Sequence, residues 1–157
     1  MRTSDFHDIF CFTMLQEIIA RSLSVKIGVY KHAVGSLHLY ERNSEAAQQF
    51  LNEGFQSTTI AMPPMPEGDP WPAIEFLLKA EATIRAGEEF DVDQINAASS
   101  YWADLVRLLQ VYRFSKDNDC DQIAELRGKM TSSTYDVFIE QRLNECRKRL
   151  MESHEKA

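Results

Sequence analysis

The residues best suited to chemistry in this sequence are the histidine and tyrosine of the segment Ser36-Leu37-His38-Leu39-Tyr40. Strict alternation there predicts a strand with Leu37 and Leu39 on one face and His38 and Tyr40 on the other. Two rings with hydrogen-bonding atoms on one face could bind one small hydroxylated ligand. A lone histidine on a strand face is also often structural, and the alternation alone leaves both interpretations open.

The other chemistry-bearing residue types lack the spacing that known sites need. The six glycines are scattered, so no glycine-rich phosphate loop is predicted. The four histidines show no helical pair or H-E-x-x-H spacing, which predicts no metal site. No elbow motif surrounds a serine, although residue order leaves a serine or cysteine nucleophile open. The three cysteines, Cys11, Cys120 and Cys146, have no C-x-x-C spacing, so buried or incidental thiols are predicted rather than a disulfide framework.

Composition and charge bound the class of protein. A chain of 157 residues, 44% hydrophobic and 26% charged, has the composition of one soluble globular domain. No apolar run reaches the roughly 20 residues of a membrane span. The acidic start does not resemble a signal peptide, which predicts a cytoplasmic location. The net charge of −7 lies mainly after residue 60, and no basic stripe offsets it, so nucleic-acid binding is disfavoured.

A proline-rich stretch divides the chain. Residues 63–70 hold four of the five prolines, and such a stretch forms neither regular helix nor central strand. The sequence therefore predicts an N-terminal part over residues 1–62, a linker over 63–70 and a helical C-terminal part over 71–157.

Upstream of the linker the pattern predicts both helix and strand. Residues 8–24 contain too many apolar side chains for a helix with one solvent-exposed face, which indicates a largely buried helix. A strand is expected over residues 29–41, a short capped helix over 43–53, and a second short strand over 57–61.

Downstream of the linker the hydrophobic period is helical throughout. Four helices are predicted from capping residues, with the bounds Pro72 to Gly87, Asp91 or Asp93 to Tyr112, Asp119 or Asp121 to Gly128, and Ser132 or Ser133 to about residue 152. In the last helix, Ile139, Leu143, Cys146 and Leu150 form a seam that indicates either ordinary bundle packing or a zipper for a partner helix. The predicted fold class is therefore α+β and helix-dominated, a helix and strand unit followed by an all-α bundle.

Three pieces of the N-terminal part resemble the second half of the thymidylate synthase family, which includes the deoxycytidylate and cytidylate hydroxymethylases. The pieces are Arg2-Thr3-Ser4-Asp5, then His7-Asp8-Ile9-Phe10 leading into residues 12–20, and then Gly35-Ser36-Leu37-His38-Leu39-Tyr40. Their order matches the family, as does the spacing between the apolar helix and the His-x-Tyr strand. The resemblance covers about the first 60 residues.

The resemblance implies a site for a pyrimidine nucleoside monophosphate. In the family an arginine and the next hydroxyl residue on a strand grip the 5′-phosphate, a following acid joins the hydrogen-bond network around pterin and pyrimidine, and a His-x-Tyr pair binds the sugar hydroxyl. The matching residues here are, in that order, Arg2, Thr3, Asp5, His38 and Tyr40. Asp8 stands where the family reads the pyrimidine edge, and an aspartate there favours the amino group of cytosine.

Several family features are not matched. The loop between Asp5 and the apolar helix is shortened, and the nucleophilic cysteine of the family lies well before the arginine, so it would fall before Met1. The folate-binding segments, the arginines lent by a second subunit and the C-terminal lid residue have no counterpart. The resemblance thus implies methylenetetrahydrofolate as the family's cofactor, but no cofactor bound by this chain alone, no catalytic residue and no activity by itself.

Three interpretations of function follow. The chain is a remnant or incomplete copy of a thymidylate synthase-like protein with a weak pyrimidine nucleotide site, a mainly helical interaction or oligomerisation module, or an unrelated soluble domain. Because so apolar a helix needs cover, and the family covers it with a sheet that forms a two-fold dimer, a homodimer through residues 8–41 is expected. Neither a nucleic acid nor a membrane is expected as a partner.

Overall fold

The computed structural model describes residues 3–36, 38–52, 54, 61–92 and 100–154. The chain divides into two compact units, an N-terminal unit of residues 1–61 with 67–69 and a C-terminal unit of residues 62–66 with 70–157. The described residues form helices joined by turns and extended segments, and none of them belongs to a β-strand. None of the helices in the described part combines the length and apolar character that crossing a bilayer requires.

The predicted α+β class is wrong for these residues, because a strand needs a backbone partner. Residues 29–36 and 38–40 run without helix, with a bend at Gly35, and they pair with no neighbouring strand in the described part of the chain. Alternation of residue types predicts to which side each side chain points. The backbone hydrogen bonds of a sheet also require a second strand. Residues 57–60 of the second predicted strand lie outside the described residues, and Ala61 is not in a strand. The expectation of a helix-dominated chain is confirmed.

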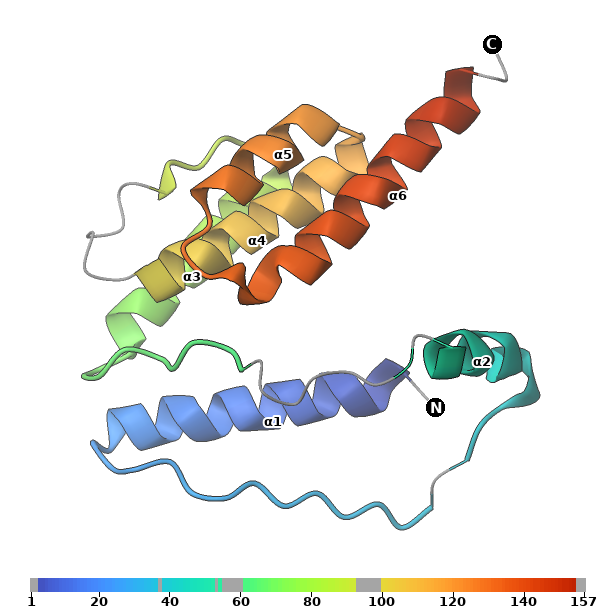
Figure 1. Cartoon of the computed structure of the whole chain (residues 1–157). Helices are drawn as coiled ribbons and strands as arrows, with labels where there is room; N and C mark the ends of the chain where they lie inside the picture. The colour runs from blue at the N-terminus through green and yellow to red at the C-terminus, as the bar shows by residue number, and fades with distance from the viewer. Residues whose placement is uncertain (1–2, 37, 53, 55–60, 93–99, 155–157) are drawn as a thin grey trace. The chain divides into compact units, whose positions relative to one another are not determined.

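The N-terminal unit contains the helices α1 (Thr3–Ser22) and α2 (Ser44–Asn52), with the short 3-10 helix η1 (Glu41–Asn43) before α2. The chain leaves α1 through Ser24, whose φ is 54°, and Val25 N–H donates to Ala20 O at 2.9 Å. An extended segment then runs back beside α1 (Figure 1), where Gln16 Nε2 donates to Gly28 O at 3.2 Å.

Most of the described side chains of α1 are not buried. Among its described hydrophobic residues only Ala20 is buried, whereas Phe10 and Phe12 are 55% and 56% exposed and Leu15 and Ile19 are each 49% exposed. The predicted helix is confirmed, but its predicted burial is wrong in this structure. Apolar composition demands a covering layer, and the described part of this unit does not supply one.

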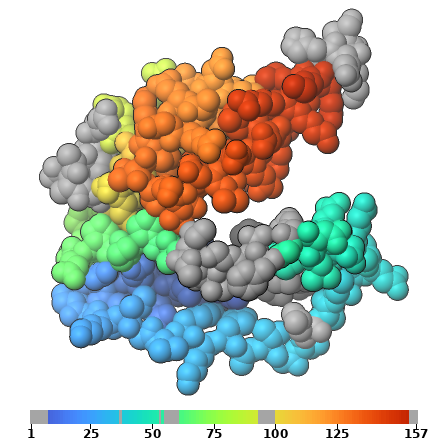
Figure 2. Space-filling model, viewed as in Figure 1, coloured from blue at the N-terminus to red at the C-terminus, as the bar shows by residue number. Residues whose placement is uncertain are grey.

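The C-terminal unit is a bundle built around a central helix. Its elements are α3 (Trp71–Ala86), α4 (Ser100–Asp117), α5 (Cys120–Lys129), η3 (Ser133–Tyr135) and α6 (Asp136–His154). The helix α4 packs against α3, α5 and α6 (Figure 1), and α5 and α6, orange to red, form one continuous surface in Figure 2. All four predicted helices are present. Of the two starts predicted for the second, Asp91 lies outside helix and Asp93 lies outside the described residues.

Local sequence signals set the helix ends in this unit. Pro72 lies in the first turn of α3, and Gly87, with φ of 85°, ends that helix. Asp119 caps α5, because its side chain accepts from Gln122 N–H at 3.1 Å. The helix α5 continues past Gly128 to Lys129, one residue beyond the predicted end.

Two apolar clusters hold the bundle together. One joins α4, α5 and α6 and consists of Val111, Ile123, Leu126, Ile139, Leu143 and Cys146, and the other joins α3 and α4 and consists of Ala80, Ile84 and Val106. Burial of each large aliphatic side chain contributes roughly 1.5 to 3 kcal/mol. The seam predicted for the last helix therefore packs within the bundle, except that Leu150 is 37% exposed.

Cys120 and Cys146 form a disulfide between α5 and α6. Their Cα atoms lie 6.0 Å apart although 26 positions separate them in sequence. The prediction of buried or incidental thiols is wrong for this pair, because spacing along the chain does not reveal which helix faces are neighbours. Cys11 is free and exposed.

Candidate functional site

The residues predicted to hold the phosphate and the base fall on α1. Thr3 and Asp5 open that helix, so the strand that the resemblance implied for them is wrong. Arg2 lies outside the described residues. Asp8 is exposed, and its side chain has no hydrogen bond or ion pair within the described part of the chain.

The structure brings His38 and Tyr40 together. Their ring centroids lie 4.8 Å apart, and the rings meet edge to face with an angle of 85°. His38 is exposed and Tyr40 is half-buried. The alternation placed these two rings on one side of the chain, and they do meet there, although the backbone is extended without being part of a sheet.

A cation lies beside this pair. The guanidinium carbon of Arg42, in η1, lies 5.2 Å from the centroid of the Tyr40 ring, a cation–π contact. The sequence prediction did not include Arg42, although a basic residue two positions after Tyr40 was the available signal. An imidazole, a phenol and a guanidinium together can donate to hydroxyl and phosphate oxygens.

A second tyrosine and histidine pair lies earlier in the same segment. Tyr30 Oη and His32 Nδ1 are 2.9 Å apart, and their rings stack with centroids 5.9 Å apart. The spacing of two positions is the same as for His38 and Tyr40, with the residue types reversed, so the pattern could have revealed it. Tyr30 and His32 therefore hydrogen-bond each other.

In the C-terminal unit, the carboxylate of Asp104 is buried, with 2% of the residue exposed. It accepts from Thr131 N–H at 3.0 Å, from Ser132 N–H at 2.9 Å and from Arg107 Nη1 at 3.0 Å. These contacts fasten the connection between α5 and α6 to α4. A carboxylate with this many donors is paired and saturated, so its role is structural.

The hydroxyl of Tyr135 lies near this carboxylate. It is buried and has no hydrogen-bond partner among the described residues. Burial raises the pKa of the Tyr135 phenol, and the negative charge of Asp104 raises that pKa further. The neutral phenol is therefore the form that the folded chain favours.

Tyr135→Phe should leave the free energy of unfolding unchanged or raise it by about 1 to 2 kcal/mol, because it removes a buried hydroxyl without a partner. The pKa is higher in the folded than in the unfolded chain. The native protein should therefore lose stability above about pH 10, and the variant should lose less. Urea unfolding at about pH 8 and about pH 11 measures both effects. A loss of more than about 1 kcal/mol in the variant would mean that the hydroxyl is bonded.

The described cavities all lie in the C-terminal unit, and the largest, of about 610 Å³, is bounded by α4, α5 and the loop after α3. Within the described residues, no group of three or more histidine, cysteine, aspartate or glutamate side chains is placed to hold a metal ion. No protein-family model matches the chain, and no curated protein gives a significant sequence match. Its function is therefore inferred from its residues and their geometry.

Proposed function

We propose that the chain is a thymidylate synthase-like protein whose N-terminal unit binds a pyrimidine nucleoside monophosphate and which has no C5-transfer activity by itself. The observation that carries this proposal is the edge-to-face contact between the exposed His38 and the half-buried Tyr40, with ring centroids 4.8 Å apart. A sugar hydroxyl both donates and accepts a hydrogen bond, and an imidazole beside a phenol supplies both counterparts. The same pair binds the sugar hydroxyl in the family that the sequence resembles.

The other ligand groups are assigned on the sequence resemblance. Arg2 and Thr3 bind the phosphate, Asp5 belongs to the surrounding hydrogen-bond network, and Asp8 accepts from the amino group of cytosine. The exposed carboxylate of Asp8 is compatible with that role. Because His38 is exposed, we expect the chain to enclose little of the ligand and to bind it with a dissociation constant on the order of 1 mM.

Titration with cytidine, uridine and adenosine monophosphates, followed by amide chemical shifts, tests this site. Cytidylate should bind best, and Asp8→Asn should shift the preference towards uridylate. The double variant His38→Ala, Tyr40→Phe should weaken binding by about tenfold. The matched control is His32→Ala, Tyr30→Phe, which alters the other pair of the same segment and should leave binding unchanged. Equal binding of adenylate, or unchanged binding in the first double variant, would contradict the proposal.

The proposal includes no catalytic turnover. The family needs a thiolate aimed at the pyrimidine ring, but none of Cys11, Cys120 and Cys146 stands at the position of the family's nucleophile. We expect no tritium release from carbon 5 of labelled deoxyuridylate or deoxycytidylate, with or without methylenetetrahydrofolate. Release above background that disappears in Cys11→Ser would show that the chain is a catalyst.

Methylenetetrahydrofolate supplies the one-carbon unit in the family, but the residues described here do not fit it. His38 is exposed, as are its described neighbours Ser36 and Leu39, and the described cavities are lined by residues of the C-terminal unit. A pterin needs an enclosed, largely apolar slot. No folate-dependent step is therefore part of the proposal.

The proposal also includes a homodimer formed through residues 8–41. Its support is the exposed apolar surface of α1, where Phe10 and Phe12 are more than half exposed. Covering each ring contributes roughly 1.5 to 3 kcal/mol. Light scattering at micromolar concentration should give a dimer that Phe10→Asp, Phe12→Asp converts to a monomer. Val137→Asp, at a 75% exposed position of α6, is the control and should leave the dimer intact. A monomeric native chain would contradict this part.

A second candidate function is a helical interaction or oligomerisation module without a ligand. It is favoured by the apolar clusters of the C-terminal unit, which give that unit a core of its own. The nucleotide titration described above distinguishes the two candidate functions. A dimer that shows no nucleotide binding would support the interaction module.

A cytoplasmic location belongs to the proposal as well, since it comes from the sequence pattern alone. Disulfides are rare in a reducing cytosol. The proposal therefore implies that Cys120 and Cys146 are reduced in the cell, and thiol trapping during lysis would test this.

A further inference from the structure

The largest described cavity is not used by the proposed function. It has a volume of about 610 Å³ and lies in the C-terminal unit between the Gly87–Val92 loop, α4 and α5. Small-molecule pockets have volumes of roughly 300 to 1,000 Å³. The cavity is thus large enough for a compact ligand.

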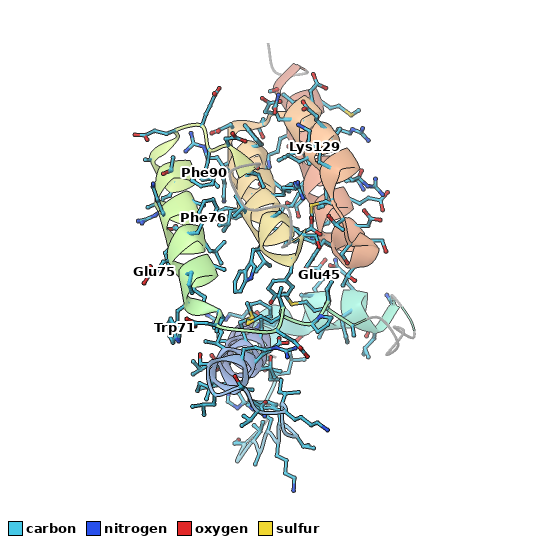
Figure 3. All side chains as sticks on the ribbon, turned by 90° about the vertical axis from the view of Figure 1, so that its left-hand side faces the viewer. Glu45, Trp71, Glu75, Phe76, Phe90 and Lys129 are labelled. Atoms are coloured by element: carbon cyan, nitrogen blue, oxygen red, sulfur yellow. A yellow bond between two sulfur atoms is a disulfide. The ribbon has the colours of Figure 1, made fainter. Side chains whose placement is uncertain are left out.

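Part of the cavity wall is apolar. Ile84 and Leu126 are buried, and Phe90 and Phe114 are partly buried beside them. Phe90 packs edge to face on Phe76 of α3, with ring centroids 5.3 Å apart, and both rings are labelled in Figure 3. The loop carrying Phe90 is thereby held against α3. This wall suits an apolar substituent.

Gln110 lines another wall and carries a buried polar atom without a partner among the described residues. Gln110 Nε2 donates to Phe90 O at 2.9 Å, which fixes the side-chain amide, because the flipped amide would set two oxygens against each other. Gln110 Oε1 is then buried without a hydrogen-bond partner among the described residues. Such an acceptor favours a ligand that brings an N–H or O–H donor.

A cation lies one turn further along the same face of α4. Arg113 is three residues after Gln110, a spacing that places both side chains on one side of the helix. Its Nε donates to Asp117 Oδ2 at 2.7 Å, and the rest of the guanidinium lies against Gly87, where an added Cβ would be 3.1 Å from Nη2. A guanidinium with N–H groups to spare binds carboxylates.

The charges around the cavity disfavour a simple anion. Three cations and four carboxylates line it, namely Arg107, Arg113, Lys129, Glu88, Glu89, Asp91 and Asp117. A ligand carrying one positive and one negative group suits such a mixed lining better than either charge alone.

We infer that this cavity binds a small zwitterion with an apolar substituent, the chemistry of a hydrophobic α-amino acid. The ammonium group donates to Gln110 Oε1, the carboxylate accepts from Arg113, and the side chain packs on Phe90 and Leu126. This inference is independent of the nucleotide site.

Titration of the full chain with L-phenylalanine, followed by calorimetry and amide chemical shifts, tests the inference. Binding in the millimolar range is expected, and phenethylamine and 3-phenylpropionate, which lack one charge each, should bind about tenfold more weakly. Arg113→Gln should also weaken binding by about tenfold. Gln110→Met, which removes the acceptor at similar size, should do the same, and thermal unfolding followed by circular dichroism checks that both variants fold.

The matched control is Arg85→Gln. Arg85 forms the same kind of ion pair one turn apart, with Nε 2.9 Å from Glu81 Oε1, but it does not line the cavity. This variant should bind L-phenylalanine as the native chain does. Absence of binding at about 20 mM, binding equal to that of phenethylamine, or binding unchanged in both cavity variants would overturn the inference.

Discussion

Replacing Asp104 by alanine should lower the free energy of unfolding by about 3 to 5 kcal/mol, because it breaks a buried ion pair by removing one partner. The side chain of Arg107 is only 14% exposed and would lose its carboxylate. The N–H groups of Thr131 and Ser132 would lose their acceptor as well. The connection between α5 and α6 would then no longer be fastened to α4, so the loss should exceed that of any single surface charge.

Urea unfolding of the native chain and the variant measures this effect. The matched control is Asp117→Ala, which removes another aspartate of α4 that pairs with an arginine. Asp117 and Arg113 are 45% and 39% exposed, so the control should change the free energy of unfolding by less than about 1 kcal/mol. Equal effects of the two substitutions would show that the Asp104 contacts do not stabilise the fold.

Reducing the disulfide between Cys120 and Cys146 should lower the free energy of unfolding by about 3.5 kcal/mol, because 26 positions separate the two cysteines and the bond restricts the unfolded chain. Cys146 belongs to the apolar cluster of α4, α5 and α6, so the reduced thiol stays buried and the fold should persist at a lower denaturation midpoint. Unfolding with and without reductant gives the difference directly.

Two variants separate the crosslink from general thiol effects. Cys120→Ser should reproduce the loss without reductant, and reductant should then have no further effect. Cys11→Ser removes the exposed free thiol and should unfold as the native chain does. If reductant leaves the denaturation midpoint of the native chain unchanged, the bond does not stabilise the folded state.

The helices of the C-terminal unit were predictable because their signals are local. Pro72 and Gly87 delimit α3, and Asp119 caps α5 through a contact with a residue three positions away. The steps between Ile139, Leu143 and Cys146 also predict which side of α6 is apolar. Contacts within one helical turn depend on neighbours in sequence, so the sequence is enough to specify them.

The candidate site was predictable only in part, because two kinds of information were needed. Alternation on extended chain was enough to bring His38 and Tyr40 together. Whether that segment joins a sheet depends on another strand, and the described residues supply none. The prediction that α1 is buried was wrong for the same reason. Apolar residues show that a helix needs a packing partner, but they do not show which segment packs on it.

By itself the sequence determined where most helices begin and end and which side of each is apolar, whereas the nucleotide-binding residues that it suggests remain a prediction. Only the tertiary structure decided that Cys120 lies beside Cys146, that Asp104 is buried against the Thr131–Ser132 backbone, and that Gln110 faces a cavity. Each of these pairings joins residues 20 or more positions apart, as between Gln110 and Phe90. They arise from how helices pack against one another, which depends on the fit of whole faces rather than on any local motif.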